Sequence, residues 1–541
     1  GCNYGKGNDH NLPQYNFLRQ VDYCSGASFA IKKMLFLKFG GFDEKYSPAY
    51  FEDTDLCFKI RKDGRIVLYQ PRSVVMHLEG ASCGKSEVSG IKSFQKKNRD
   101  KFFATWRKSL SNHFDSSGDF TTHYRAANRL NGKKTILVID SSLPYYDKES
   151  GGHRIYSILK ILRSQNYNLI FLPTNEIADE PYASELSSIG VELLVDESRE
   201  NGFKKFLYER LDIIDFAWIC RPQMFDQFGK FLEKKSNAKI IYDTIDLHHL
   251  RLKRKWILNG GNDRKLEKKW KQFYKKEKKF SKQSDITLTV TQDEAKVVER
   301  WDVKRVFVLP NIHVPRGGQI PPFSGRGGLL FIGSYLHPPN VDAVKFLVNE
   351  ILPIVWRKFP QMQVTLLGSN PNNDVLDLST DRVKVTGFIE DVVPYFDLAQ
   401  IFVSPLRYGA GMKGKIGQSM SLGLPVVSTN IDEIVNYCET FKLKMCFDIS
   451  HSMLTCNHLN QDFYEFAEKI LPFTAHIHMG DARGVNGEGL QIGDGEIDFI
   501  RLNKIIQNSP NNISFIPEIW QGHKNEGEGF WIALERLNGK I

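Results

Sequence analysis

The segment PLRYGAGMKGKIGQSMSLGLPVVST at residues 405–429 is rich in glycine and lysine. It follows the apolar run IFVSPL (401–406), which predicts a strand, and it leads into a helix expected to begin near Ile416. Glycines let the backbone approach a bound diphosphate, whose charge is met by helix N–H groups and by lysines. The segment therefore predicts an anion site at a strand end; the alternative is a basic surface loop whose glycines only allow turning. The residues expected to form the site are Arg407, Gly409, Gly411, Lys413, Gly414 and Lys415.

On both sides of this segment, short β-branched runs alternate with stretches of helical periodicity. Such alternation predicts parallel sheets covered by helices, and a Pro/Gly-rich stretch at 314–328 divides the pattern into two domains. Parallel sheets bind ligands at the carboxyl ends of their strands, so the cleft between the domains is the expected active site. The expected strands are 135–140, 169–174, 191–196, 216–220, 239–244, 286–291, 329–334, 363–369, 383–388, 401–406 and 424–429.

Together with PNIH (310–313) and FIGSYLHPPNVDAVKFL (331–347), the glycine-rich segment closely resembles group 1 (family 4) glycosyltransferases of the GT-B fold. The resemblance implies two Rossmann-like domains, an acceptor domain at 134–313 and a donor domain at 328–437. It also implies transfer of a hexose or N-acetylhexosamine from a nucleotide diphosphate-sugar, with retention at the anomeric carbon and no cofactor. The implied acceptor is a glycan or a lipid-linked sugar in polysaccharide biosynthesis.

The resemblance carries site residues onto the donor domain. Many family members bind the donor ribose through a glutamate, and this chain has Gln418 at the matching helix start, whose amide can still bond to hydroxyls. Gly333 and Ser334 end the first strand of the domain and are expected to offer N–H groups to the diphosphate. The Arg/Lys often found just after them is absent, so Arg407 and the two lysines are expected to compensate.

On the acceptor side, Gly151 and Gly152 lie between a strand end and a probable helix and match the family's glycine loop near the transferred sugar; a simple turn is the alternative. The string YDTIDLHHLRLKRK (242–255) places polar side chains at the interdomain mouth. A surface loop is the alternative there. The residues expected to act are Asp246 and His248 in catalysis and Asp243 and Arg251 on the acceptor side.

Charge is concentrated in residues 251–282, which hold fourteen Lys/Arg against three Asp/Glu, while the whole chain carries a net charge of +10. Apolar residues at spacings near four and seven predict a helix with one packed stripe. The basic face is either merely solvated or meets anionic lipid headgroups or a lipid-diphosphate acceptor. Nucleic-acid motifs are lacking, so no nucleic-acid partner is expected.

The amino-terminal segment, residues 1–105, is similar to the second half of family 2 glycosyltransferases with a GT-A fold. By that resemblance Asp53 matches the base that deprotonates the attacking hydroxyl, and His77 matches a metal ligand for Mg²⁺ or Mn²⁺. The alternative is an acidic cluster that caps a helix. The family's donor-binding strands lie upstream of Gly1, so the domain is partial, and a linker is expected at 106–133. The strings that carry the resemblance are VDYCSGASFAIKK (21–33), GGFDEKYSPAYFEDTDLCFKIRKDG (40–64) and VVMHLEG (74–80).

In the carboxyl-terminal segment, polar residues of metal-ligand type follow each of three apolar strands at 444–454, 475–484 and 515–523. The segment resembles the last four βα units of xylose-isomerase-like TIM barrels, which use a divalent metal, so 442–541 is expected to be a partial barrel. By resemblance, Asp448, His478 and Glu518 match metal ligands of Mg²⁺ or Mn²⁺, and His451 matches a substrate contact.

The chain is thus expected to be an α/β mosaic of a partial GT-A domain, a GT-B pair and a partial TIM barrel, either a fragment or a gene fusion. Two alternatives to glycosyl transfer stay open: an incomplete mosaic that only binds sugars or nucleotides, and a metal-dependent sugar isomerase or epimerase. Without a long apolar run or an export signal, the chain is expected to be cytoplasmic, peripheral at the inner membrane face. Eight cysteines without a CxxC pair are expected to be reduced thiols.

Overall fold

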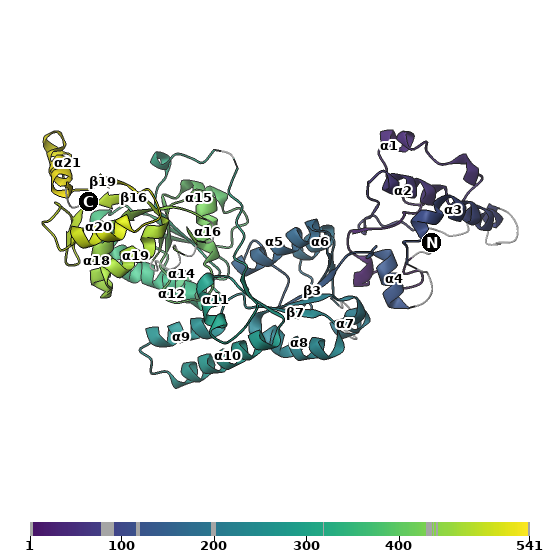
Figure 1. Ribbon diagram of the computed structural model, residues 1–541, viewed down its shortest axis with the longest axis horizontal. Coiled ribbons are helices and arrows are strands. Elements are labelled where there is room, and N and C mark those ends of the chain that lie inside the picture. The colour runs from purple at the N-terminus through teal and green to yellow at the C-terminus, as the bar shows by residue number, and fades with distance from the viewer. Residues whose placement is uncertain are drawn as a thin grey trace.

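A computed structural model of the chain describes residues 4–76, 91–114, 119–195, 202–317, 319–428, 435, 438–439 and 442–538. The molecule is elongated, with the amino-terminal segment at one end, the two large α/β domains in the middle and the carboxyl-terminal unit at the other end (Figure 1). Within the described ranges, no helix combines the length and the apolar character needed to cross a membrane.

The first domain is built on a parallel sheet of seven strands in the order β5-β4-β3-β6-β7-β8-β9. Its central strands are buried on both faces, as their near-continuous β-branched and apolar sequences predict. The order reverses between β3 and β6, and parallel sheets bind ligands beyond the strand ends at such a point. The strands are β3 Thr135–Asp140, β4 Asn168–Pro173, β5 Val191–Leu193, β6 Phe216–Cys220, β7 Lys239–Asp243, β8 Ile286–Thr289 and β9 Val306–Val308. The helices that cover it are α5 Ser150–Ser164, α6 Tyr182–Ser188, α7 Phe203–Arg210, α8 Arg221–Lys235 and α11 Gln292–Glu299.

The second domain has a parallel sheet of five strands in the order β12-β11-β10-β13-β14. Here the reversal lies between β10 and β13, so the loop that follows β13 leaves the sheet at the expected ligand position. The prediction of two parallel α/β sheets in the middle of the chain is confirmed. The strands are β10 Leu329–Ile332, β11 Val364–Leu367, β12 Val383–Gly387, β13 Ile401–Ser404 and β14 Val426–Ser428. The helices are α12 Pro338–Phe346, α13 Leu352–Lys358, α14 Asn373–Leu376, α15 Val393–Leu398 and α16 Gly414–Ser421.

The basic segment 251–282 forms parts of two helices, α9 (His248–Leu258) and α10 (Arg264–Gln283), where a single helical stripe was predicted. A short turn joins them, and they run side by side as a hairpin at the lower edge of the first domain in Figure 1. Leu266, Trp270 and Phe273 are partly buried and Phe280 is fully buried, so the predicted stripe does pack.

At the amino-terminal end, short helices surround a two-stranded antiparallel sheet. The described parts of the predicted linker 106–133 contain the end of α3 and all of α4. Tyr124 of α4 is fully buried and donates a hydrogen bond to Glu192, while Arg210 donates to Gln14 Oε1 at 3.0 Å. These elements are β1 Arg19–Gln20, β2 Leu68–Tyr69, α1 Lys33–Lys38, α2 Glu52–Lys62, α3 Phe94–Leu110 and α4 Phe120–Ala127.

The carboxyl-terminal unit has a parallel sheet in the order β15-β16-β19. Among the described residues this sheet has three strands, one fewer than the four βα units expected, and it does not close on itself. The partial TIM barrel therefore stays a prediction. The elements are β15 Met445–Asp448, β16 Thr474–Met479, β17 Asp481–Arg483, β18 Gly487–Leu490, β19 Ser514–Pro517, α18 Ile449–Leu459, α19 Phe463–Ile470, α20 Phe499–Gln507 and α21 Lys524–Leu537.

Candidate functional site between the two central domains

A strained turn after β7 directs Asp246 to the interdomain mouth. Ile245 has a φ of 60°, and the Asp246 N–H donates to the carbonyl of Thr244 at 2.7 Å across it. A β-branched residue at positive φ is an outlier that persists only where its surroundings hold it, and such strain gathers at functional sites. The turn is therefore a local sign that the position of Asp246 matters.

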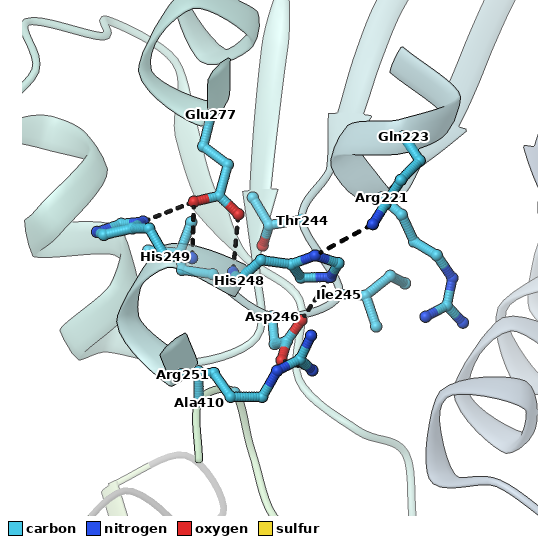
Figure 2. A network of polar contacts seen from close by, with 12 residues as sticks. Arg221, Gln223, Thr244, Ile245, Asp246, His248, His249, Arg251, Glu277 and Ala410 are labelled. Atoms are coloured by element: carbon cyan, nitrogen blue, oxygen red, sulfur yellow. Dashed lines mark hydrogen bonds and ion pairs between the residues drawn. The ribbon is translucent and has the colours of Figure 1, made fainter. Parts of the chain in front are cut away.

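Asp246 is nearly buried and joins two basic side chains (Figure 2). His248 Nε2 lies 3.0 Å from Asp246 Oδ1, and Arg251 Nη1 lies 2.5 Å from Oδ2. Burial alone would raise the pKa of Asp246, but the charges of His248 and Arg251 outweigh it and hold the pKa well below its usual range. Asp246 thus remains ionised at neutral pH, which makes it an anchor for its two partners and a weak base.

His248 itself is held from two sides. It begins α9, and Glu277 of α10 accepts its backbone N–H at 2.7 Å together with that of His249 at 3.2 Å. On the other side, Gln223 Nε2 lies 3.4 Å from His248 Nδ1. Both ring nitrogens therefore have partners, and the hairpin fixes the imidazole in place (Figure 2).

The glycine-rich loop of the second domain closes over this turn. The Gly411 N–H donates to Glu294 Oε1 at 2.8 Å, and the same oxygen accepts the N–H of Leu247 at 3.0 Å. Gly411 has a φ of +70°, and a Cβ there would lie 3.0 Å from the Cβ of Asp246. Glycine is needed both for the conformation and for the close approach, and Glu294 ties the two domains together.

Sequence reasoning missed Glu294. The string TQDE (291–294) is typical of a capping box, in which the glutamate returns to its own helix start. Thr291 does accept the N–H of Glu294 at 3.2 Å, but the carboxylate crosses to the other domain. Burial and then the neighbouring charge of Asp246 raise the pKa of Glu294 to about 7, against the opposing effect of the two N–H groups.

Basic groups and helix starts surround the space beside the loop. Lys415 Nζ lies 2.5 Å from Asn340 Oδ1, and Lys413 Nζ lies 3.0 Å from the carbonyl of Ala410. The starts of α16 and α5 touch, because a Cβ on Gly414 would come within 2.4 Å of Ser150 Cβ. Two positive helix ends and two lysines at one place suit an anion.

His337, another group that sequence reasoning left out, lies just before α12 on the same side. Desolvation of the ring, followed by the charges of Arg251 and Lys415, lowers the pKa of His337 to about 4, although the residue keeps contact with solvent. Its imidazole is neutral at physiological pH and can donate a hydrogen bond to a sugar or phosphate oxygen.

Four predicted donor residues have other partners or surroundings. Arg407 pairs with Asp342 through contacts of 2.5 and 3.0 Å, so its charge is already met. The Gly333 N–H donates to the carbonyl of Leu367 at 3.1 Å and is not available to a diphosphate. Ser334 accepts from Asn340 at 2.8 Å through its carbonyl, which helps to hold the partner of Lys415. Gln418 lies partly buried on α16.

On the acceptor side, Asp243 is fully buried inside the first domain, where it accepts from Arg154 at 2.8 Å and from Trp218 at 3.0 Å. It does not face the interdomain space as predicted, because Arg154 of α5 and Trp218 of β6 hold its carboxylate inside the first domain. Gly152 is required for packing, since a Cβ there would lie 2.7 Å from the carbonyl oxygen of Tyr145. Gly151 lies at the start of α5, and a Cβ there would meet only ordinary contacts.

A hollow of about 1000 Å³ lies at the amino ends of the strands of the seven-stranded sheet, away from the second domain's glycine-rich loop. Its lining includes Thr135, Phe216 and Lys239 at the amino ends of β3, β6 and β7. Because parallel sheets bind ligands at their carboxyl ends, and because none of the predicted site residues lines this hollow, the interdomain space remains the better candidate.

In the amino-terminal segment, Asp53 lies in the first turn of α2. Its Oδ2 accepts the N–H of Gly26 at 2.8 Å, and its Oδ1 accepts the N–H of Thr54 at 2.6 Å. The carboxylate thus contacts the loop that contains Gly26, which belongs to one of the strings that carry the resemblance. His77 lies outside the described residues.

The predicted metal ligands of the carboxyl-terminal unit do come together. One ligand atom from each of Asp448, His478 and Glu518 lies within 4.8 Å of the others, at the carboxyl ends of β15, β16 and β19. Two carboxylates and an imidazole suit a divalent cation such as Mn²⁺, which fits the expectation of Mg²⁺ or Mn²⁺. His451 Nδ1 lies 2.7 Å from Asp448 Oδ2, and that contact raises the pKa of His451 to about 9.

Comparison with known proteins agrees with the predicted family for one part of the chain. Residues 326–447 match the family model of group 1 glycosyl transferases, which covers the predicted donor domain and the start of the next unit. Over 96 residues, or 17% of this chain, the sequence is 31% identical to an N-acetylglucosaminyl-diphospho-decaprenol L-rhamnosyltransferase of Mycobacterium tuberculosis, covering 31% of it. Over 112 residues, or 19% of this chain, it is 26% identical to an uncharacterized 44.6 kDa protein in the cps region of Klebsiella pneumoniae, covering 29% of it. The matches thus span about a third of the length of these relatives.

Solved structures are more distantly similar. A sucrose-phosphate synthase from Thermosynechococcus elongatus matches with a TM-score of 0.41 and 15% identity over 55% of this chain and 81% of its own. Anabaena HepE in complex with UDP and glucose matches with a TM-score of 0.38 and 14% identity, over 55% of this chain and 80% of HepE. The strand orders of the two parallel sheets define the two-domain fold.

Proposed function

We propose that the chain is a glycosyltransferase that uses a nucleotide diphosphate-sugar and that its reaction takes place between the two central domains. The observation that carries the proposal is the closure of the Gly411 loop on the Asp246 turn through Glu294. This contact places the matched family segment, with its lysines and helix start, directly against a strained polar turn of the other domain.

In the proposed reaction, Lys413, Lys415 and the starts of α16 and α5 hold the diphosphate. The bond between the anomeric carbon and the diphosphate breaks, and the acceptor oxygen forms the new bond. The departing phosphate oxygen takes the proton of the acceptor hydroxyl, and the positive groups stabilise its charge. Retention at the anomeric carbon and transfer of a hexose or N-acetylhexosamine are part of the proposal. Because these cations meet the charge, the reaction requires no metal.

Asp246 and His248 act as positioning residues in this account. The lowered pKa of Asp246 makes it a poor proton acceptor, and both ring nitrogens of His248 have partners. Their effect is to hold Arg251 and the start of α9 beside the reacting groups. His337, neutral in this setting, is placed to donate a hydrogen bond to the donor.

The proposed acceptor is a glycan or a lipid-linked sugar. Support comes from two relatives, one named for an N-acetylglucosaminyl-diphospho-decaprenol substrate and the other for a cps region. A role in polysaccharide biosynthesis at the cytoplasmic face of a membrane follows from the same proposal. Asp53 and His77 of the amino-terminal segment stay predictions.

Binding of free UDP, GDP and dTDP, measured by calorimetry, tests the proposal. Lys413→Ala/Lys415→Ala is expected to weaken binding of the preferred nucleotide by about 10-fold to 100-fold, the usual effect of removing charged hydrogen-bond partners. Lys230→Ala, an exposed lysine on α8, is the matched control. Equal binding by parent and double variant would overturn the proposed site.

A second function is favoured by the cluster of Asp448, His478 and Glu518. We propose that this unit holds a divalent cation, Mg²⁺ or Mn²⁺, which would polarise substrate oxygens as in a sugar isomerase or epimerase. Calorimetric titration of Mn²⁺ into the parent and Glu518→Gln tests it, and unchanged affinity would rule out the cluster as the site.

A further inference from the structure

The hairpin of α9 and α10 carries a lysine face that nothing in the proposed reaction uses. Its lysines recur every three, four or seven residues, which places them on one face of α10, opposite the packed stripe. None of them forms an ion pair with an acid in the described part of the chain. These exposed residues are Lys265, Lys268, Lys269, Lys275, Lys279 and Lys282.

The tip of the hairpin is apolar. Ile257 is 58% exposed and Leu258 is 40% exposed at the end of α9, just before the turn at Gly260 and Gly261. Exposed branched side chains beside a cluster of basic groups are typical of segments that enter the boundary between lipid headgroups and acyl chains. A solvated face alone explains the lysines, but it does not explain the exposed tip.

The hairpin is fixed to the candidate site along the length of α9. Glu277 binds the start of α9, Arg254 Nη1 donates to the carbonyl of Gly409 at 2.7 Å, and Lys255 lies over the ring of Tyr408. With eleven residues in α9, the tip lies roughly 16 Å from the start of the helix at 1.5 Å per residue. If the tip and the lysine face bind a surface, the interdomain site is therefore held at a fixed distance from that surface.

We propose that this hairpin docks the protein on an anionic lipid surface, with the lysine face on the headgroups and with Ile257 and Leu258 adding apolar contact. The face holds six lysines, which bind headgroups as point charges, and one arginine, Arg264, at the start of α10. It does not present the several arginine forks and stacked aromatic rings that nucleic-acid surfaces use. The apolar tip also fits a lipid boundary better than a nucleic acid. A lipid-linked acceptor follows from the docking, and that further step rests on the proposed function.

The test is flotation of the full chain with vesicles, without any nucleotide-sugar. We expect binding to vesicles of phosphatidylglycerol and phosphatidylcholine, little binding to phosphatidylcholine alone, and loss of binding at high salt. Lys268→Glu/Lys275→Glu/Lys279→Glu is expected to reduce binding at least tenfold. The control Lys204→Glu/Lys230→Glu/Lys234→Glu makes the same charge change at exposed positions of α7 and α8 and should stay within twofold of the parent.

A second variant keeps the test decisive if the charge reversal alters folding. Ile257→Ser/Leu258→Ser should reduce binding several-fold while leaving its salt dependence unchanged, and Ile161→Ser, also half exposed, should not reduce it. The proposal is overturned if the parent fails to bind anionic vesicles, if both hairpin variants bind like the parent, or if the parent prefers single-stranded RNA over vesicles. Because no donor is present, these outcomes are independent of glycosyl transfer.

Discussion

The interdomain site and the cluster on β15, β16 and β19 are both assembled from polar residues at the ends of parallel strands, yet they differ in enclosure. The Asp246 side chain is only 12% exposed, whereas the His478 and Glu518 side chains are 37% and 49% exposed. Strand ends gather side chains in both places, but in the first the glycine-rich loop of the second domain closes over Asp246. The comparison shows that contact between two domains encloses charges that strand ends alone leave open to solvent.

The two regions also differ in the charge of the ligand that they are expected to bind. Lysines and helix starts dominate the interdomain space, so it favours an anion. Two carboxylates and an imidazole dominate the cluster, so it favours a cation. Perturbations that separate anion binding from cation binding therefore test the comparison directly.

The largest loss of sugar-transfer activity is expected from Gly411→Val. The new side chain would have to occupy space 3.0 Å from Asp246 Cβ at a φ of +70°, which pushes the loop away from the turn. Displacement of a reacting group by about 1 Å typically costs about 100-fold in rate, so transfer should fall by at least that factor. Initial rates of sugar transfer would measure the loss.

The matched control is Gly387→Val, because Gly387 has a φ of +73° but open space around its Cβ position. Both variants meet the same backbone strain, so thermal unfolding should shift similarly in the two. If Gly387→Val lost as much activity as Gly411→Val, the close approach of the domains would not be the cause.

A somewhat smaller effect is expected from Glu294→Ala, which removes the acceptor shared by Gly411 and Leu247. Loss of a carboxylate that accepts two N–H bonds should lower kcat by about 10-fold to 100-fold. Glu294→Gln keeps a carbonyl oxygen for the same bonds and should restore most of the activity. Steady-state kinetics would show a fall in kcat greater than the change in KM, and a pure KM effect would argue against a positioning role.

The same residue predicts a pH dependence of stability. The pKa of Glu294 is about 7 in the folded chain, above the usual unfolded value of about 4.3, so the folded state binds more protons between these two pH values. The free energy of unfolding contributed by Glu294 is therefore present at low pH and is lost as pH rises from about 4 through 7, by at most about 4 kcal/mol. Chemical unfolding at several pH values should show this slope in the parent and a smaller one in Glu294→Gln.

A still smaller effect on transfer, but a clear one on metal binding, is expected from Asp448→Asn. The change removes one of three gathered ligand groups, so Mn²⁺ affinity should fall about tenfold or more, within the range known for altered metal sites. Transfer from the donor should stay within twofold because the cluster lies outside the interdomain site. Electron paramagnetic resonance of bound Mn²⁺ measures the first quantity, and a matching loss of transfer would contradict the separation of the two regions.

Much of this arrangement could be predicted from the sequence, because apolar runs and glycine-lysine spacing are local signals. The two sheets, the loop after β13 and the grouping of Asp448, His478 and Glu518 follow from strand ends alone. Glu294 could not be predicted, since its partner Gly411 lies 117 residues further along the chain and its own surroundings match a helix cap.

Residues at one strand end can also face opposite ways. Asp243 and Asp246 lie three positions apart, but Asp243 is bound to Arg154 and Trp218 inside the first domain. Asp246, beyond the strained turn at Ile245, lies against Gly411 of the second domain. Arg407 has the charge that a diphosphate needs, yet Asp342 on a separate helix already meets it. The orientation and the partner of such side chains depend on tertiary contacts, which cannot be deduced from composition and spacing.

The most direct measurement of the central claim is turnover of a panel of UDP-, GDP- and dTDP-sugars by the parent chain and by Lys413→Ala/Lys415→Ala, with and without chelator. Arg407→Ala is the control, because that arginine is already paired with Asp342. The account predicts chelator-resistant transfer from at least one donor, retained in Arg407→Ala and abolished in the double lysine variant. Absence of turnover with every donor, or turnover that needs metal and survives loss of both lysines, would contradict it.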